Sequence, residues 1–121
     1  MAYVDGFVLT VPKDRLADYV KIARKASKVW MDHGALEVRE CVGDDLDIKE
    51  MVPFPKLARA KPDETVIFSW IVFKSKADRN RVNAKVMKDP RIEKMMKGSP
   101  PFDCKRMGYG GFKMVVNEVA E

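Results

Sequence analysis

The chain has 121 residues, 46% of them hydrophobic and 34% charged, a balance that suits one compact globular domain with a modest core. No apolar run approaches the roughly 18 residues that span a membrane, and the first residues lack the basic and apolar regions of a secretory signal, so we expect a cytoplasmic protein without membrane contact. The net charge of +5 permits attraction to polyanions but does not require it.

The first predicted elements are a strand and a long helix. β-Branched and aromatic residues fill Tyr3–Val11, and Pro12 ends this strand. Apolar residues then recur at steps of three and four, which predicts a helix over about Lys13–His33. Gly34 follows at the position where helices commonly close in a left-handed conformation. One face of the helix is formed by Leu16, Val20, Ala23, Ser27 and Trp30.

Two further strands enclose a long irregular segment. The second strand is predicted over Leu36–Val42, and the third and clearest over Thr65–Phe73. Between them, residues of about 45–64 contain three prolines and no sustained period. We predict that this segment is a partly ordered flap, because its apolar residues give it something to dock. These residues are Met51, Val52, Phe54 and Leu57.

Capping signals define the remaining helices. Ser75, with Asp78 three residues later, resembles a capping box and begins a helix that ends near residue 88. Asp89 and Pro90 supply the N-cap and first position of a short helix ending near residue 96. A fourth strand is predicted over Met107–Val116. The order β-α-β-β-α-β predicts an α+β fold, a ferredoxin-like antiparallel sheet with helices on one face.

The strands are apolar on both faces, which bears on assembly. An antiparallel sheet with one solvated face should alternate apolar and polar residues, and these strands do not alternate cleanly. Two helices cover only one face, so we infer that a second copy covers the other, giving a homodimer that pairs into a dimeric α+β barrel. One face carries Val4, Val8, Val66, Phe68, Trp70 and Val72. The opposite face carries Phe7, Leu9, Val11, Ile67, Ile71 and Phe73.

Several chemistries lack their sequence motifs. Cys41 and Cys104 have no CxxC spacing and too few partners for a zinc site or a disulfide framework, so we predict reduced thiols. The chain has no glycine-rich phosphate loop, no HExxH motif and no GxSxG elbow. We therefore expect neither a metal nor another cofactor.

Three stretches carry a resemblance to a known family. They read YVDGFVLTVP near the start, FSWIVF in the third strand and MKDPRIEKMMKGSPPFDCKRMGYGGF near the end. The chain thereby resembles the YbaA-like family of uncharacterised bacterial proteins, domain of unknown function 1428, over nearly its whole length. It departs at Pro100, where the family usually has methionine, and in the flap. The resemblance implies the dimeric α+β barrel superfamily, but the family has no established reaction, and kinship of fold does not transfer chemistry.

Glycines in the last strand raise the question of a cavity. Gly108 and Gly110 fall on one face together with Phe112, and two missing side chains in succession open space there. In the structural explanation, a helix packs close against Gly108 and Gly110, or Gly110 and Gly111 form a bulge that curves the sheet for dimer closure. In the functional explanation, the space belongs to a ligand cavity, either between helices and sheet or between two sheets.

Candidate site residues follow from chemistry and position. His33, Asp5 and Tyr109 are the candidate catalytic groups, with His33 or Asp5 as proton acceptor and Tyr109 as donor. His33 also stands where it could cap the first helix, and the strand residues could be core groups with one satisfied hydrogen bond. Arg91 and Arg106 could bind a carboxylate or form structural ion pairs. The candidate ligand-binding residues are Tyr3, Trp70, Phe102, Arg106, Gly108, Gly110 and Arg91.

These residues support three functional hypotheses. The first is binding of a small apolar or anionic molecule in a cavity bordered by Trp70, Tyr109 and the flap. The second is an enzyme resembling the cofactor-independent oxygenases or isomerases of the superfamily, and the third is an interaction module without a ligand. A basic helical face could bind RNA weakly, but it lacks interleaved aromatic residues, so we do not expect nucleic-acid binding. That face includes Lys21, Arg24, Lys25 and Lys28.

Overall fold

The structure, a computed structural model, describes residues 1–121 as an α+β protein. Its four strands form one antiparallel sheet in the order β2-β3-β1-β4. The strands are β1 (Tyr3–Pro12), β2 (Glu37–Val42), β3 (Glu64–Phe73) and β4 (Gly108–Lys113). The α-helices are α1 (Leu16–Asp32), α2 (Phe54–Leu57), α3 (Lys76–Met87) and α4 (Pro90–Met96). Short 3-10 turns occur at Lys13–Arg15 and Cys104–Arg106.

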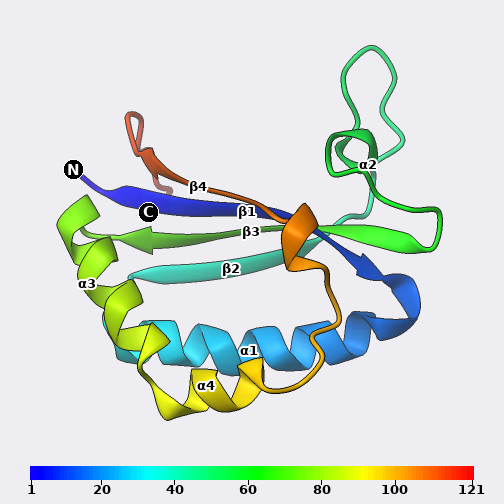
Figure 1. Cartoon of the computed structure of the whole chain (residues 1–121). Coiled ribbons are helices and arrows are strands. Elements are labelled where there is room, and N and C mark those ends of the chain that lie inside the picture. Colours follow the sequence, from blue (N-terminus) through cyan, green and yellow to red (C-terminus); the bar gives the residue numbers. More distant parts are fainter.

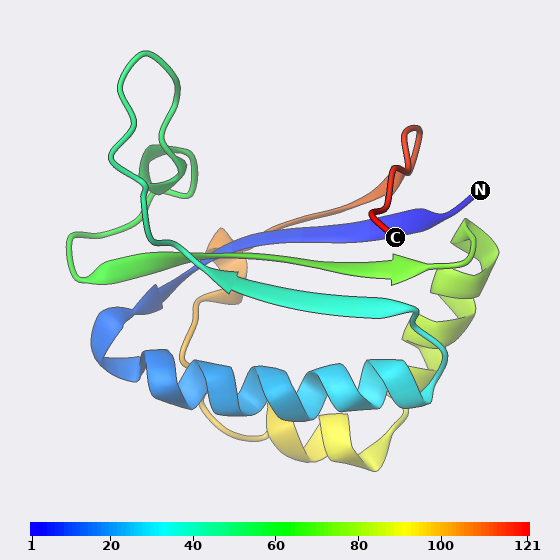
Figure 2. The ribbon, with the colours of Figure 1, turned by 180° about the vertical axis from the view of Figure 1, so that it is seen from behind.

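Helices α1, α3 and α4 all lie on one face of the sheet, and no helix layer covers the other face (Figures 1 and 2). The flap rises beyond the uncovered face at one end of the sheet, and both termini lie near the opposite end. We call the two faces of the sheet the helix face and the outer face. The helix face contains the core, and the outer face is open in a single chain.

The predicted elements are present, and two of their ends lie three residues from the predicted position, while the others differ by no more than one. The long helix begins at Leu16 rather than Lys13, because the chain first makes a 3-10 turn after Pro12. The last strand ends at Lys113 rather than Val116. Its only neighbour is β1, whose first paired residue, Tyr3, lies opposite Lys113. One further backbone hydrogen bond, from Met114 N–H to the Ala2 carbonyl at 3.1 Å, ends the pairing there.

The capping signals act as predicted. Ser75 accepts a hydrogen bond from the backbone N–H of Asp78 at 3.0 Å and begins α3. Asp89 accepts from the backbone N–H of Arg91 at 2.9 Å and begins α4, with Pro90 at the first position. Gly34 has a φ of 118°, so the chain leaves α1 through a conformation that side chains with a Cβ rarely adopt.

The strand alternation assigns the core to the helix face. Phe73 is fully buried there against Val82 and Val86 of α3, and Ile67 and Val11 are fully buried in a second group beneath α1. Removing such side chains from water is the main stabilising contribution to the fold. Two groups of buried residues share the partly buried Phe7, which places this ring at the middle of the helix face.

The outer face is apolar and exposed in a single chain, as the strand pattern predicted. Phe68 of β3 retains 44% of its accessible surface and Phe112 of β4 retains 60%. Phe54 of the flap meets Phe68 edge-on at the end of this face, with the ring centroids 5.8 Å apart. The other apolar residues that were expected to dock the flap, Met51, Val52 and Leu57, are exposed. Trp70 lies beside Phe68 at 5.6 Å, and its indole N–H donates to Glu37.

The glycines of β4 have three different surroundings, and none marks a bulge. Pairing between β1 and β4 runs without interruption from Tyr3–Lys113 to Val8–Gly108. The ring of Phe112 lies over Gly110, so an aromatic side chain fills part of the space on the outer face. The predicted packing of a helix against Gly108 and Gly110 is wrong, because only atoms of Val8 and Phe112 lie near them. The close approach is at Gly111 instead, where a Cβ atom would stand 2.6 Å from the Tyr3 hydroxyl.

Gly111→Ala should destabilise the protein by about 1–3 kcal/mol, because the new methyl group must displace Tyr3 and also Arg79, whose Nη2 would lie 2.9 Å away. Gly108→Ala is the matched control on the same strand, since its Cβ would meet nothing nearer than 3.6 Å. We expect the control to be neutral or slightly stabilising. Urea unfolding of both variants measures the difference, and equal effects would show that the close approach at Gly111 has no energetic consequence.

Candidate functional site

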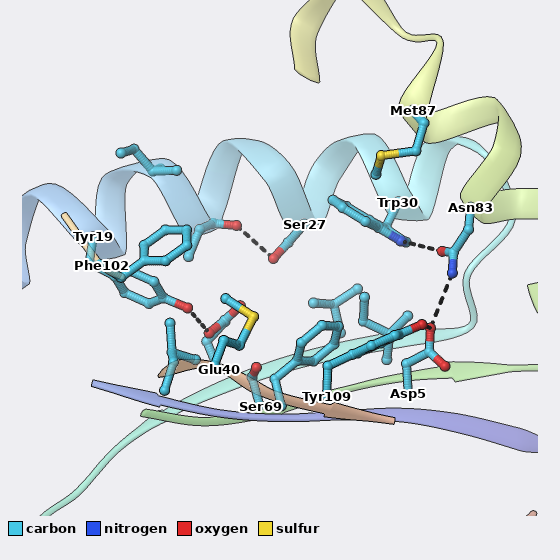
Figure 3. A pocket seen from close by; sticks show the side chains of 17 residues that line it. Asp5, Tyr19, Ser27, Trp30, Glu40, Ser69, Asn83, Met87, Phe102 and Tyr109 are labelled. Atoms are coloured by element: carbon cyan, nitrogen blue, oxygen red, sulfur yellow. Dashed lines mark hydrogen bonds between the residues drawn. The ribbon is translucent and has the colours of Figure 1, made fainter. Parts of the chain in front are cut away.

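A cavity of about 460 Å³ separates the helices from the sheet (Figure 3). Its roof is formed by α1 and α3, and its floor by the helix face of all four strands. The wall is mainly apolar and contains no lysine, arginine or histidine. The polar and aromatic residues of the lining include Asp5, Tyr19, Glu40, Ser69, Phe102 and Tyr109. This volume lies within the range of about 300–1,000 Å³ that small-molecule pockets occupy.

Strand register places polar residues on the cavity floor. Glu40 of β2 lies opposite Ser69 of β3, which lies opposite Phe7 of β1, which lies opposite Tyr109 of β4. These four residues form one row across the sheet. Asp5 belongs to the next row along β1, two residues from Phe7. The floor therefore carries two carboxyl groups, with a serine hydroxyl and an aromatic ring between them.

At one end of the cavity, Asp5 is held by three neighbours. Its side chain is 1% exposed, and Oδ2 accepts hydrogen bonds from Asn83 Nδ2 at 3.2 Å and from the Tyr109 hydroxyl at 3.1 Å. Arg79 Nε lies 3.6 Å from Oδ1, close enough for an ion pair but without a hydrogen bond. Asn83 accepts in turn from the Trp30 indole at 3.0 Å, which ties Asp5 to the roof.

Tyr109 and Arg79 complete this polar end. Burial raises the pKa of the Tyr109 hydroxyl, and the charge of Asp5 raises it further, so Tyr109 keeps its proton and acts as a donor. The guanidinium of Arg79 donates to the Tyr109 hydroxyl at 3.4 Å and to the Tyr3 hydroxyl at 3.3 Å, and it lies over the Tyr3 ring. Chemically, the pair of Asp5 and Tyr109 can accept and donate a proton at the cavity wall.

The other end of the cavity is formed by Tyr19 and Glu40. The buried Tyr19 hydroxyl donates to Glu40 Oε1 at 2.8 Å. Burial, together with the Glu40 charge, raises the pKa of Tyr19 above its usual range, so Tyr19 too stays protonated. Partial burial raises the pKa of Glu40, and the hydrogen bond from Tyr19 works against this rise. Glu40 keeps an exposed side chain on the edge strand β2, so this end of the cavity is open to solvent.

The predicted site residues divide between the two faces of the sheet. Asp5, Tyr109 and Phe102 line the cavity on the helix face, where the edge of the Tyr19 ring also meets Phe102. A more open hollow of about 780 Å³ lies on the outer face. Trp70, Gly108 and Gly110 line that hollow, together with the edge of Tyr109. Tyr109 is thus the one predicted residue that borders both spaces.

Tyr3, His33 and Arg91 line neither space. Tyr3 is buried beside the cavity under Arg79. His33 stands at the C-terminus of α1, where Nε2 lies 2.8 Å from Asp89 Oδ2. Arg91 bonds the same carboxylate at 2.9 Å and bridges to Asp32 at 2.8 Å. Hydrogen bonds from Arg91 and then His33 hold the pKa of Asp89 far below its usual range, and the cluster joins α1 to α4.

Arg106 also lies outside the cavity and is committed to ion pairs. Its guanidinium makes a two-point contact with Glu64, with Nη2–Oε2 at 2.6 Å and Nη1–Oε1 at 2.9 Å. It also contacts Asp103 at 3.3 Å. The hydrogen bond from Arg106 lowers the pKa of Glu64 to about 2, from 4.5 for the free side chain. This contact ties the turn before β4 to the start of β3.

Arg106→Met should lower the free energy of unfolding by about 2 kcal/mol at pH 7, because it leaves a nearly buried carboxylate without its partner. Folding depresses the pKa of Glu64, so this stabilisation is complete above pH 4.5 and is lost as the pH falls towards 2. The gap between the variant and the parent protein should therefore close between pH 5 and about pH 2 in urea unfolding experiments.

Arg15→Met is the control for this experiment, since its ion pair with Asp18 is exposed and 3.6 Å long. We expect an effect below about 0.5 kcal/mol at every pH. A gap for Arg106→Met that stayed constant between pH 5 and 2 would contradict the assignment of the stabilisation to Glu64.

Tyr19, Glu40, Ser69 and Asn83 are polar cavity residues that were not among the candidate site residues predicted from the sequence. A usable signal existed for two of them. Glu40 interrupts an otherwise apolar run of alternate residues on β2, and Ser69 does the same between Ile67 and Ile71 on β3. Polar residues on the strand face that points towards the helices indicate a cavity with polar groups on its wall rather than a packed apolar core. Tyr19 and Asn83 lie on helices at positions that no such alternation marks.

Two further observations concern metal binding and membrane spans. No group of three or more histidine, cysteine, aspartate or glutamate side chains is arranged to hold a metal ion. None of the helices combines the length and the apolar character that crossing a membrane requires.

The fold and site define a class of protein: a small α+β protein with a lined cavity between its helices and its antiparallel sheet. The chain belongs to the family described as "Protein of unknown function (DUF1428)", whose model matches residues 2–104. It is 42% identical to "Uncharacterized protein YbaA" of Escherichia coli strain K12 over 118 residues, covering 98% of this chain and all of the relative. The same values hold for the protein of that name from Shigella flexneri. The family resemblance read from the sequence is thus confirmed.

Among solved structures, the "De novo designed protein Foldit4" aligns with 94% of this chain and 99% of its own length, with a TM-score of 0.48 and 13% identity.

Proposed function

We propose that this protein binds a small, largely apolar molecule in the cavity between its helices and its sheet. The observation that carries the proposal is an apolar cavity of about 460 Å³ with hydrogen-bonded polar groups at both ends. Apolar walls with a few polar groups in fixed positions are typical of ligand sites. The carboxylates of Asp5 and Glu40 and the hydroxyls of Tyr19 and Tyr109 supply those groups.

Fluorescence titration with N-phenyl-naphthylamine, a neutral apolar probe, tests this proposal. Ala23 of α1 lines the cavity and is 7% exposed, so Ala23→Leu should fill the space and weaken probe binding by about tenfold. Ala17→Leu is the control, because Ala17 is exposed on the same helix. Equal binding by both variants and the parent would contradict the cavity assignment. Native mass spectrometry of the freshly purified protein complements the titration, since a reproducible extra mass supplies a ligand to identify.

We further propose that two copies pair through their outer faces as a dimeric α+β barrel. The β-α-β-β-α-β chain order and the strand order β2-β3-β1-β4 support the ferredoxin-like assignment. The exposed aromatic residues of the outer face support pairing, since contiguous apolar patches of this kind commonly mark interfaces. Pairing would enclose the hollow that Trp70 lines and make it a second candidate site.

The exposed free thiols of Cys41 and Cys104 support a reducing compartment such as the cytoplasm.

The second candidate function is acid–base catalysis without a cofactor, on a molecule bound in the same cavity. The hydrogen bond between the Tyr109 hydroxyl and Asp5 at 3.1 Å favours it, because an acceptor and a donor stand together at the wall. His33 does not border the cavity, so Asp5 is the acceptor in this proposal. Turnover of the molecule identified by mass spectrometry, lost in Tyr109→Phe while binding persists, is the expected result.

A further inference from the structure

The two carboxylates of the cavity differ in how their charge is compensated. Asp5 has Arg79 Nε at 3.6 Å from Oδ1, and its Oδ2 accepts from both Asn83 and Tyr109. Oδ2 is therefore occupied, and Oδ1, which accepts no hydrogen bond, is buried next to the Arg79 guanidinium. Glu40 receives a single hydrogen bond, from Tyr19 to Oε1, and no lysine, arginine or histidine nitrogen lies within 4.0 Å of it. Glu40 is thus the solvent-accessible carboxylate, without a cationic partner, that has capacity left for a ligand.

A free hydroxyl group lies beside Glu40. Ser69 stands directly opposite Glu40 on the neighbouring strand, which places the two Cβ atoms about 5 Å apart. Ser69 is 4% exposed and lines the cavity, yet its hydroxyl has no hydrogen-bond partner within the protein. A serine hydroxyl can accept as well as donate. Together, Glu40 and Ser69 form an acceptor-rich corner at the open end of the cavity.

We propose, on the basis of the function proposed above, that the ligand carries a hydrogen-bond-donating head group, a hydroxyl or a protonated amine, which Glu40 and Ser69 receive. An ionised carboxylate accepts only, and hydrogen bonds to it are stronger than neutral ones. The lining holds no cationic side chain that could compensate a second negative charge. An anionic head group would stand unpaired beside Glu40, which disfavours carboxylate ligands.

The apolar body of the ligand fits between the two polar ends. Glu40 and Asp5 are two strands and two residues apart, so their Cα atoms are about 12 Å from each other by sheet spacing. Ser69 and Phe7 lie between them on the floor, and Phe102 and Met107 add apolar walls. A body of two fused rings suits this space. The ligand class is therefore an amphipathic aromatic or alicyclic alcohol or amine.

Three probes that share a naphthalene body and differ only in their head group test how the head group affects affinity. Naphthylmethylamine and naphthylmethanol carry donors, and naphthoate carries a carboxylate. Isothermal titration calorimetry at pH 7 should show both donor probes binding at least about tenfold more tightly than naphthoate. Naphthoate binding as tightly as the donor probes would overturn this inference while leaving the cavity function intact. Failure of all three probes and of N-phenyl-naphthylamine would contradict the proposed function itself.

Glu40→Gln assigns the preference to one side chain. The glutamine oxygen can still accept from Tyr19, so the local contacts persist while the charge is lost. We expect naphthylmethylamine to bind about tenfold more weakly to this variant and the discrimination against naphthoate to disappear.

Glu37→Gln is the matched control, because Glu37 lies on the same strand but faces outward, where it accepts from Trp70. Its affinities should match those of the parent. A preference that survives in Glu40→Gln, or that is lost equally in Glu37→Gln, would refute the assignment to Glu40.

Discussion

Asp5→Ala should lower the free energy of unfolding by about 3–5 kcal/mol, the largest effect that we expect from a single polar substitution in this protein. Asp5 is 1% exposed, and its removal leaves Arg79, whose side chain is 18% exposed, without its carboxylate. Asn83 and Tyr109 lose their acceptor at the same time. Urea unfolding at pH 7 measures the loss, at one fixed protein concentration because self-association would shift apparent stability.

Two further variants separate the buried charge from a general effect of losing an aspartate. Asp47→Ala removes an exposed carboxylate in the flap and should change stability by no more than about 0.5 kcal/mol. Arg79→Met combined with Asp5→Ala should cost less than the sum of the two single changes, because the double variant leaves no unpaired charge. Additive losses, or an Asp5→Ala effect below about 1 kcal/mol, would show that Arg79 is adequately solvated without Asp5.

Phe68→Lys should convert a dimer into monomers. Phe68 lies on a central strand of the outer face and is 44% exposed in the single chain, so it would be buried against the partner sheet in the proposed pairing. In the proposed pairing a lysine there would bury a positive charge against the partner sheet. Removing a central aromatic contact from an interface commonly costs about 2 kcal/mol or more, on the order of a thirtyfold loss of affinity. Native mass spectrometry and light scattering report the change.

Met31→Lys is the control for assembly. Met31 is 46% exposed, slightly more than Phe68, but it lies on α1 in the helix layer. The same charge is introduced there without touching the outer face, so the oligomeric state should stay that of the parent. A parent protein that is monomeric at micromolar concentration would contradict the pairing, as would a Phe68→Lys variant that remains dimeric.

Local sequence signals were sufficient for most of the elements, because each has a short-range physical cause. Ser75 and Asp89 satisfy backbone donors at helix starts, Pro12 ends a strand, and Gly34 accepts a backbone conformation closed to other residues. The two-residue period of β3 is sufficient to place Phe68 and Phe73 on opposite faces of the sheet. Such features depend on neighbours within a few positions.

The candidate site was only partly within reach of the sequence. Asp5, Phe102 and Tyr109 were singled out and do line one cavity. Trp70 was predicted to border the same cavity but lies on the outer face. The pairing register decides which positions of neighbouring strands share a face, and the sequence does not give that register. Arg91 and Arg106 looked available for a ligand, whereas each is occupied by carboxylates brought from distant parts of the chain.

The sequence by itself determined the elements, their order and the apolar character of both sheet faces, since these follow from backbone conformation and side-chain period. Tertiary structure decided which residues meet. The strand order β2-β3-β1-β4 placed Glu40 beside Ser69, and the packing of α1 and α3 over the sheet brought Tyr19 to Glu40 and Asn83 to Asp5. The last two contacts join residues 21 and 78 positions apart, and no local propensity encodes a separation of that kind.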